Sequence, residues 1–385
     1  MKILLVTIEP PLPFSTAAAK WFYVLITELE KRGHEVVCFS TCSRVKDQEE
    51  ARKIFPEEKL KLYSFPKKRN FLNRVGSILR PYSYMFSKEF LQDLSQECQK
   101  DYDIIHIEQL WAGWAIPDSV YDKSLINVHH LVTIDLEETK KTNFSAWYEY
   151  KQTVRAETIL LKKFFHHRFF TSRISAKAHQ LGKLPQGQKT VVPFSLDANL
   201  YPFKLPTLES KKIGMIASMG WYPGKSAALN LLQSVYPEVQ REIPEVEVHL
   251  AGWNAKAELL SYVGQTGVHI FENIPQVESF FHSLSVFVYL PSRGSGMKIK
   301  VLEAMMYGIP VVTTEEGLEG LPAIHGIHAM IATNSSQAAK YTIELLNDKK
   351  KSQGISAMAR ALIESHCGKE KVVSEIEKIY KDIKG

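Results

Sequence analysis

The chain has 385 residues, of which 45% are hydrophobic and 23% charged, and its formal net charge is +6. This length exceeds one compact core and suits two domains of ordinary size, and the composition excludes a disordered or collagen-like chain. No apolar run approaches the roughly 20 residues that a membrane span requires. The apolar start, residues 1–13, is short, contains Glu9 and has no small-residue cleavage site, so we expect a first β-strand and not a signal peptide.

The N-terminal half alternates short apolar strands with amphipathic helices. A continuous apolar run predicts a buried strand at 2–8, and after a Pro-rich loop the periodicity predicts a helix from about Ala17 to Lys31, ended by Gly33. Such alternation is typical of a parallel sheet with helices on both faces. Further strands of this half are expected at 35–39, 103–107, 125–129 and 168–172.

Residues 52–80 carry nine Lys or Arg residues against two Glu, with aromatic and apolar residues between them. The default interpretation is a solvated, positively charged loop region. The sharper alternative is a patch that contacts a membrane surface or an anionic acceptor, since basic residues with aromatic neighbours favour acidic headgroups. Nucleic acid is not an expected partner, because no recognition motif accompanies the charge.

The second half repeats the alternation of strands and helices. Between the halves, residues 193–211 are rich in Pro and polar residues and are expected to link two domains. The tail, residues 369–383, has helical periodicity. Strands of the second half are expected at 212–218, 246–251, 268–271, 286–290 and 310–313.

The four cysteines have neither Cys-x-x-Cys spacing nor paired histidines at zinc-finger intervals. We expect reduced, mostly buried thiols, as in a cytoplasmic protein, with a peripheral position on the inner face of the membrane as an alternative location. The cysteines are Cys38, Cys42, Cys98 and Cys367.

The most informative stretch is residues 292–321. A loop of small residues at 294–296 leads directly into an amphipathic helix, which Gly308 ends. Such a loop points several backbone N–H groups at one place, and the helix dipole favours an anion there. Lys298 and Lys300 add positive charge, and Glu303 follows on the same helix. We read a cradle for a nucleotide diphosphate, against the alternative of an ordinary loop with Glu303 paired to Lys300 at i,i+3.

The stretch as a whole resembles the motif of the retaining family-4 (group 1) glycosyltransferases, G-x-G-x-(K/R)-x-K-x-L-E-A-M-x-x-G-x-P-V-V-x-T, followed by an acidic-Gly turn. The resemblance covers nearly the whole chain and is densest from Ile213 to Leu321. The matching residues are Gly294, Gly296, Lys298, Lys300, Leu302, Glu303, Ala304, Met305, Gly308, Pro310, Val311, Val312, Thr314, Glu319 and Gly320.

This resemblance implies an α/β protein with two Rossmann-like, doubly wound parallel-sheet domains that face a central cleft, which is the B-type glycosyltransferase (GT-B) fold. Residues 1–195 would form the acceptor-binding domain, and the last helix, at about 369–385, would pack back on it. Residues 205–367 would form the domain that binds the nucleotide sugar.

The resemblance also implies roles for individual residues. Lys225, Lys298 and the amides of the loop would hold the phosphates, Glu303 the ribose, and Ile274 the base through backbone contacts. His129, at the end of a strand, would contact the sugar and its phosphate and is the expected catalytic residue. The full donor-binding set is Ser218, Met219, Gly220, Lys225, Ile274, Gly294, Ser295, Gly296, Met297, Lys298, Lys300 and Glu303, and the loop near the acceptor or diphosphate is Thr16, Ala17 and Ala18.

Three positions depart from the family pattern. Met219 stands where an arginine is expected, Ser295 replaces the first of two glutamates, and Ala17–Ala18 replace a Gly-Gly pair. Alanine does not adopt positive φ cheaply, so the backbone there is expected to approach a ligand less easily.

Neighbouring acidic residues and histidines are weaker candidates. Asp101 and Asp103 form an Asp-x-Asp pair of the kind that binds a metal–nucleotide complex in the other glycosyltransferase fold, but here the pair precedes its strand, so no metal role is expected. His106 and Glu108, at the other end of that strand, are candidates for contact with the acceptor.

The expected function is the transfer of a hexosyl group from a nucleotide-diphosphate sugar to a hydroxyl acceptor, lipid-linked, glycan or other, with retention and without a metal or cofactor. The alternative is a non-catalytic relative that binds sugar nucleotides or glycans, which the three departures favour. A nucleotide-sugar epimerase of the same fold is a lesser rival, because no acid/base pair for it can be placed in the sequence.

Overall fold

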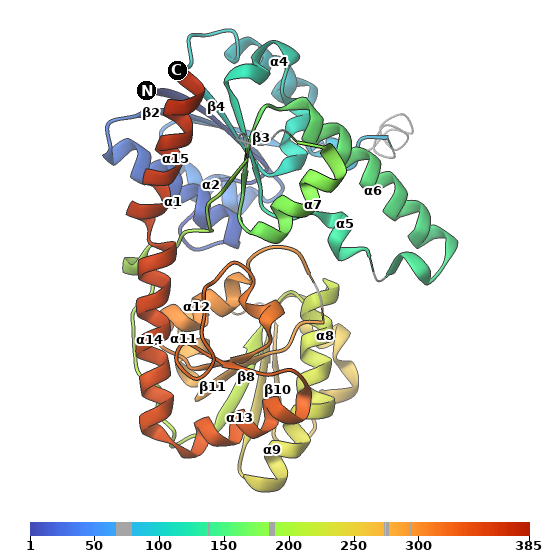
Figure 1. Cartoon of the computed structure of the whole chain (residues 1–385), viewed down its shortest axis with the longest axis vertical. Coiled ribbons are helices and arrows are strands. Elements are labelled where there is room, and N and C mark those ends of the chain that lie inside the picture. Colours follow the sequence, from blue (N-terminus) through green and yellow to red (C-terminus); the bar gives the residue numbers. More distant parts are fainter. Residues whose placement is uncertain (67–78, 138, 185–188, 273, 275–276, 293) are drawn as a thin grey trace. The chain divides into compact units, whose positions relative to one another are not determined.

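The computed structural model describes residues 1–66, 79–137, 139–184, 189–272, 274, 277–292 and 294–385. These residues form two compact units. Unit 1 contains Met1–Leu196 and Lys369–Gly385, and unit 2 contains Asp197–Gly368. Each unit is built around one parallel sheet with helices packed against it (Figure 1).

Unit 1 has a seven-stranded parallel sheet in the order β3-β2-β1-β4-β5-β6-β7. Its inner strands read as continuous buried runs, as expected for strands covered on both faces. The strands are β1 (Lys2–Thr7), β2 (Glu35–Cys42), β3 (Leu60–Ser64), β4 (Ile104–Glu108), β5 (Ser124–Val128), β6 (His166–Phe169) and β7 (Lys189–Val191).

The helices of unit 1 bury their apolar faces against this sheet. The last helix, α15, packs beside α1 in Figure 1 and also contacts β4, so the chain end belongs to the first unit. The helices are α1 (Ala17–Lys31), α2 (Val45–Ile54), α4 (Lys88–Glu97), α5 (Val132–Asp135), α6 (Phe144–Lys163), α7 (Ser172–Gly182) and α15 (Lys369–Lys384).

Unit 2 has a six-stranded parallel sheet in the order β10-β9-β8-β11-β12-β13. Its strands are β8 (Lys212–Ile216), β9 (Glu247–Ala251), β10 (Val268–Phe271), β11 (Val286–Tyr289), β12 (Val311–Thr313) and β13 (Met330–Ile331). Its helices are α8 (Tyr222–Asn230), α9 (Tyr236–Glu242), α10 (Ala255–Glu258), α11 (Val277–Ser283), α12 (Ile299–Tyr307), α13 (Ser335–Asn347) and α14 (Lys349–Cys367), with a π-helical segment at Leu231–Val235.

Short 3₁₀ turns occur in both units. In unit 1 they lie at Ser83–Met85, Leu110–Ala115, Asp118–Lys123 and Thr139–Lys141, and in unit 2 at Ala198–Leu200, Leu260–Tyr262 and Glu315–Leu318.

Both sheets reverse their strand order at one point, between β1 and β4 in unit 1 and between β8 and β11 in unit 2. In open parallel sheets, ligands bind beyond the carboxyl ends of the strands at such a switch point. The loops after β8 and β11 are therefore the first place to look for a ligand site in unit 2.

The predicted fold class is confirmed, since both halves form parallel α/β sheets. The strands β3, β7 and β13, each at the edge of its sheet, were not predicted from the sequence. β3 corrects the interpretation of 52–80 as a loop region, because residues 60–64 alternate Leu60 and Leu62 with Lys61 and Tyr63 and form an edge strand. Residues 67–78 of that stretch lie outside the described residues.

The four cysteines are all buried, as predicted, and form no disulfide with one another. Among the described residues, no helix combines the length and the apolar character needed to cross a membrane.

Candidate functional site

The loop between β11 and α12 is held together by the side chain of Lys298. Its Nζ donates to the carbonyl oxygens of Gly294, at 3.2 Å, and Gly296, at 2.7 Å, and lies 3.3 Å from a carboxylate oxygen of Glu319. Only 9% of the Lys298 side chain is exposed. Gly296 has a φ of +83°, which a residue with a Cβ adopts only with strain. Lys298, which the sequence predicts to be a phosphate-binding cation, therefore stabilises the loop by bonding within it.

The start of α12 has the features of an anion site. Lys298 occupies the N-cap position and makes no side-chain hydrogen bond that caps the helix. Nearby, the N–H of Gly294 donates to Glu316 Oε1 at 3.1 Å. Backbone N–H groups and a helix N-terminus favour negative charge, and here the Gly294 N–H contacts a carboxylate of the protein itself. The loop therefore already binds one oxyanion.

Glu303 lies inside unit 2, with 1% of its side chain exposed. Lys300 Nζ donates to its Oε2 at 2.8 Å, and the Tyr201 hydroxyl donates to its Oε1 at 3.4 Å. Burial, together with the charge of Glu303, raises the pKa of Tyr201, so this hydroxyl keeps its proton. The pair of Glu303 with Lys300, left open as an alternative by the sequence, is present in the structure.

The loop after β8 presents backbone and small groups. Ser218 and Gly220 are exposed, whereas Met219 is 1% exposed and its N–H donates to the carbonyl oxygen of Trp253 at 3.0 Å. A Cβ on Gly220 would lie 2.2 Å from the ring of Trp253, so the chain passes close beneath that ring. Met219 is thus a packing residue at the position where an arginine was expected.

Lys225 lies on α8, the helix that follows this loop. Its Nζ donates to Glu258 Oε2 at 2.6 Å, and 43% of its side chain is exposed. The start of α8 meets the loop after β11, because the hydroxyls of Ser226 and Ser292 lie 2.9 Å apart and Gly294 packs against Pro223. The structure therefore brings α8 and residues 294–298 together at the switch point of unit 2.

A cavity of about 520 Å³ opens at the end of β10. Ile274, which is half-buried, lines it together with Phe271 and Phe280. Cavities of this size with apolar walls accommodate small ligands. Ile274 follows β10, whereas residues 294–298 follow β11, and the sheet order places β9 and β8 between these two strands. Ile274 therefore lies at a different part of the carboxyl end of the sheet from residues 294–298.

In unit 1, His129 directly follows β5 and is 9% exposed. Its Nε2 lies 2.5 Å from Glu108 Oε2, and the same oxygen accepts a hydrogen bond from Asn127 Nδ2 at 2.7 Å. The other carboxylate oxygen, Oε1, accepts from Trp21 Nε1 at 2.9 Å and lies 3.0 Å from His106 Nε2. The carboxylate of Glu108 therefore has N–H groups of other side chains close to both of its oxygens. Its contact with Nε2 fixes the orientation of the His129 ring.

The charges of this cluster follow from burial and from its neighbours. Burial acts to raise the pKa of Glu108, but His106 and His129 outweigh it and hold that pKa well below its ordinary value. Burial lowers the pKa of His129, which is only partly offset by its hydrogen bond to Glu108. Burial also lowers the pKa of Arg168 to about 10, so this guanidinium, which stacks on the Trp21 ring at 4.6 Å, remains charged. At neutral pH the cluster thus contains an ionised Glu108 and a neutral His129.

The sequence did not predict this network. His106 and Glu108, taken as contacts for the acceptor, are both fully buried, so that interpretation is wrong. His106 Nδ1 instead pairs with the Tyr380 hydroxyl at 2.5 Å, across 274 residues of sequence. Polar residues at the ends of two neighbouring strands, β4 and β5, were the signal that could have indicated it.

The first loop of unit 1 ends at Thr16, whose hydroxyl accepts from the Ala19 N–H at 3.1 Å and caps α1. Ala17 and Ala18 form the first turn of this helix. The expected cost of alanine at positive φ therefore does not arise at these two positions, because they have helical backbone.

Asp103, one half of the Asp-x-Asp pair, has a structural role at the start of β4. Its carboxylate accepts from the Lys2 N–H at 2.8 Å and pairs with Lys384 Nζ at 2.8 Å. The hydrogen bond to Lys384 and that to Lys2 hold its pKa below the ordinary value.

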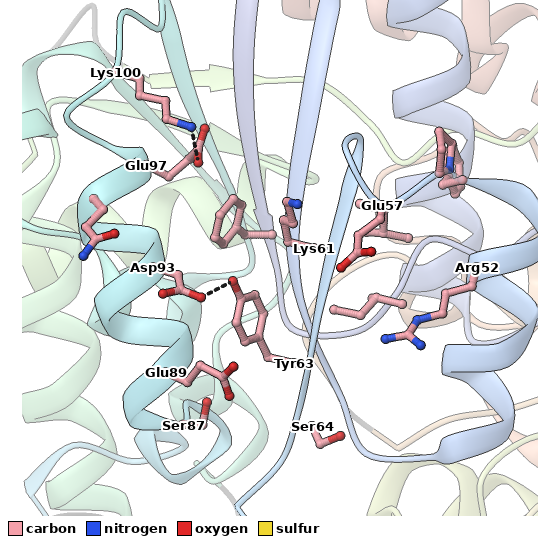
Figure 2. Close-up of a pocket in the computed structure, with 16 residues that line it drawn as sticks. Arg52, Glu57, Lys61, Tyr63, Ser64, Ser87, Glu89, Asp93, Glu97 and Lys100 are labelled. Atoms are coloured by element: carbon pink, nitrogen blue, oxygen red, sulfur yellow. Dashed lines mark hydrogen bonds and ion pairs between the residues drawn. The ribbon is translucent and has the colours of Figure 1, made fainter.

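A second cavity, of about 870 Å³, lies beside the edge strand β3. Figure 2 shows Tyr63 of β3 pointing at Asp93 of α4, to which its hydroxyl donates at 2.8 Å. One basic residue next to this strand is matched by an acid, since Lys59 pairs with Glu30 at 2.7 Å. The charged residues that line the cavity are Arg52, Glu57, Lys61, Glu89, Asp93, Glu97 and Lys100.

Comparison with known proteins places these features in a class. Residues 210–348 match the family model described as "Glycosyl transferases group 1". One curated relative, an uncharacterized 44.6 kDa protein in the cps region of Klebsiella pneumoniae, is 26% identical over 156 residues, which are 38% of this chain and 40% of that protein. The match thus spans well under half the length of that relative.

Solved structures match almost the whole chain at low identity. HepE of Anabaena, in complex with UDP and glucose, is 13% identical with a TM-score of 0.70, covering 99% of this chain and 100% of that one. Sucrose-phosphate synthase of Thermosynechococcus elongatus is 14% identical with a TM-score of 0.72, covering 99% and 98%. A glycosyltransferase of Rickettsia africae is 14% identical with a TM-score of 0.66, also covering 99% and 98%.

The two lines of comparison agree. The chain has the GT-B fold of the glycosyltransferases. The match to the group 1 glycosyltransferase family model lies within its second unit, and residues 294–303 fall inside the matched segment.

Proposed function

We propose that this protein transfers a hexosyl group from a nucleotide-diphosphate sugar to a hydroxyl acceptor, with retention of the anomeric configuration and without a metal. The observation that carries the proposal is the segment 294–303. It joins β11 to α12 at the switch point, binds a carboxylate through Gly294 N–H, and carries Lys298, Lys300 and Glu303 within the group 1 domain.

In this proposal the diphosphate replaces the carboxylate of Glu316 at the Gly294 amide. The added negative charge would be met by Lys298 and by the N-terminus of α12. Lys300, 33% exposed, would turn from Glu303 toward the phosphates, which frees the Glu303 carboxylate to accept from ribose hydroxyls. Lys225 would exchange Glu258 for a phosphate oxygen in the same way. The remaining donor contacts are assigned to the backbone of Ser218, Met219, Gly220, Ser295, Gly296 and Met297, with Ile274 at the base.

The transfer step would break the bond between the sugar C1 and the phosphate oxygen and form one between C1 and the acceptor oxygen on the same face. The proton of the acceptor hydroxyl would pass to the departing phosphate oxygen. The protein then contributes by holding both substrates and stabilising the charge that develops on the phosphate. His129 would accept a hydrogen bond from the sugar through Nδ1, because its Nε2 is directed at Glu108.

The acceptor is assigned to unit 1. Thr16, Ala17 and Ala18 lie at the carboxyl end of β1, where the sheet order of unit 1 reverses. Residues 52–80 are basic in composition. We therefore include in the proposal a lipid-linked or otherwise anionic acceptor, and contact of this stretch with the inner face of the cytoplasmic membrane.

The proposal is tested with a panel of uridine, guanosine and adenosine diphosphate sugars, by measuring nucleotide release with and without simple sugar acceptors. We expect one donor to be turned over. Glu303→Ala should weaken nucleotide binding, and His129→Ala should abolish transfer while leaving nucleotide affinity unchanged. Normal kinetics of both variants would reject the site.

A non-catalytic relative that binds sugar nucleotides is the second candidate. The buried Met219 favours it, because the loop after β8 then lacks the expected arginine side chain at the phosphates. Calorimetric binding of a nucleotide sugar without turnover by any donor and acceptor would support this candidate over the enzyme.

A further inference from the structure

Three potential metal ligands share one face of the unit 2 sheet, on β9 and β10 and away from residues 294–303. Glu247 and His249 are two residues apart on β9, so their side chains point to the same face. His269 on β10 is the register partner of His249 in the parallel pair. The sheet therefore places a carboxylate and two imidazoles side by side.

The distances between these groups suit one small cation. His249 Nε2 lies 3.0 Å from Glu247 Oε2, and His269 Nε2 lies 3.7 Å from the same oxygen. All three ligand atoms lie within 4.8 Å of one another. Ligands at 2.0–2.1 Å from a tetrahedral Zn²⁺ are about 3.3 Å apart, so small side-chain rotations bring all three into place.

We propose that Glu247, His249 and His269 bind a divalent transition metal ion such as Zn²⁺, with the fourth position taken by water. Two imidazoles and one carboxylate are a ligand set that such ions favour over Mg²⁺ or Ca²⁺. The side chains of His269 and Glu247 are 44% and 39% exposed, so the ion can enter from solvent. The ion takes the place of the proton between His249 Nε2 and Glu247, and the neutral imidazole then carries its proton on Nδ1.

The ion would join the edge strand β10 to β9, its neighbour in the sheet order of the described residues. His249 also lines the 520 Å³ cavity at the end of β10, and its ring packs 5.5 Å from that of Phe271. Metal binding would therefore stiffen one wall of this cavity. The site is independent of the transfer chemistry, for which we propose no metal.

Lys212 is the competing cation at this place, with its Nζ 3.9 Å from Glu247 Oε2. An ion of charge +2 with direct ligand bonds would displace this weak contact. Lys212→Ala is therefore expected to bind the metal at least as tightly as the unchanged protein, whereas loss of a ligand should have the opposite effect.

The test is titration of the untagged 385-residue chain with Co²⁺, followed by its visible absorption, and with Zn²⁺ by calorimetry. We expect one equivalent per chain, and a rise of the thermal midpoint when Zn²⁺ is added. His269→Asn and Glu247→Gln should each weaken binding by about 100-fold or more, since even outer-shell partners of metal ligands contribute 10- to 100-fold. His179→Asn, at an exposed histidine of α7, is the control and should bind normally.

His269 and Glu247 are partly exposed, so these variants should fold even if a change at the buried His249 does not. The proposal is overturned if the protein takes up no stoichiometric ion, or if the His269→Asn and Glu247→Gln variants bind Zn²⁺ as tightly as His179→Asn does.

Discussion

At the scale of single residues, Glu108 determines which nitrogen of His129 carries the proton. The carboxylate lies 2.5 Å from His129 Nε2 and is ionised, so Nε2 holds the proton and Nδ1 is left as the acceptor. Glu108 touches no proposed substrate atom, so it is a positioning residue. The proposed role of His129 therefore depends on a fully buried neighbour.

We predict that Glu108→Gln lowers kcat by about 10- to 100-fold, at or below the lower end of the roughly 10²- to 10⁴-fold that a positioned acid or base contributes, because Glu108 acts only through His129. Burial lowers the pKa of His129 and the hydrogen bond that its ring donates to Glu108 raises it, so loss of this bond lowers that pKa further. The acidic limb of the pH–rate profile, where neutral His129 is lost, should move to lower pH. A fall in activity without this shift would mean that Glu108 has only a structural role, and Glu58→Gln, at an exposed site, is the control.

A second single-residue prediction concerns Glu157 on α6, which is fully buried and bonded to Thr133. Burial raises its pKa to about 7 from an ordinary value of 4.5. Between these two pKa values the folded state therefore holds a proton on Glu157 that the unfolded state has released. This protonation stabilises the folded state fully below pH 4.5, and the stabilisation is lost as the pH rises through 7. The full effect is at most about 3 kcal/mol.

Glu157→Gln should remove this pH dependence, because the amide does not titrate. Urea unfolding midpoints at pH 5 and pH 8 measure this pH dependence of stability. Relative to the unchanged protein, the variant should be more stable at pH 8. Glu149→Gln, the same change at an exposed position of α6, should leave the difference between the two pH values unaltered. Equal behaviour of the two variants would contradict the assignment.

At the scale of elements, the loop from β11 to α12 depends on the left-handed backbone of Gly296 and on the bonds that Lys298 Nζ makes within it. We predict that Gly296→Ala costs about 1 kcal/mol of stability and lowers nucleotide affinity by tenfold or more, because the amides move out of place. Calorimetry with nucleoside diphosphates measures the affinity.

Gly264→Ala is the matched control for this variant. Gly264 has nearly the same φ, +85°, and nothing within 4 Å of an added Cβ, but it lies in the turn before β10. It should cost similar stability and leave nucleotide affinity unchanged. If both variants lost affinity equally, the effect would come from general strain and not from the loop at α12.

At the scale of the whole molecule, the sequence was sufficient for the fold class but not for the arrangement of the site. Long apolar runs such as 2–8 predicted the central strands, because burial on both faces leaves a continuous pattern. The three-residue β7 and the two-residue β13 are too short to show a repeating pattern of apolar and polar residues. In the candidate site, the glycine loop and α12 were placed correctly in sequence, since local rules govern them.

What the sequence could not supply were contacts between distant residues. Tyr201 with Glu303, Glu316 with Gly294, and Glu108 with His129 are separated by many residues and meet only in the folded chain. The inward direction of Lys298 has the same origin, because its partners Glu316 and Glu319 follow the next strand.

The most direct test of the central claim is hydrogen–deuterium exchange of the whole protein with and without a saturating nucleoside diphosphate. If the diphosphate is anchored by the loop after β11, amide exchange should slow across residues 294–303, with a smaller change at 218–225. The Glu303→Ala variant should lose most of this protection at the same nucleotide concentration. Protection confined to other segments, with 294–303 unchanged while the nucleotide is bound, would contradict the account.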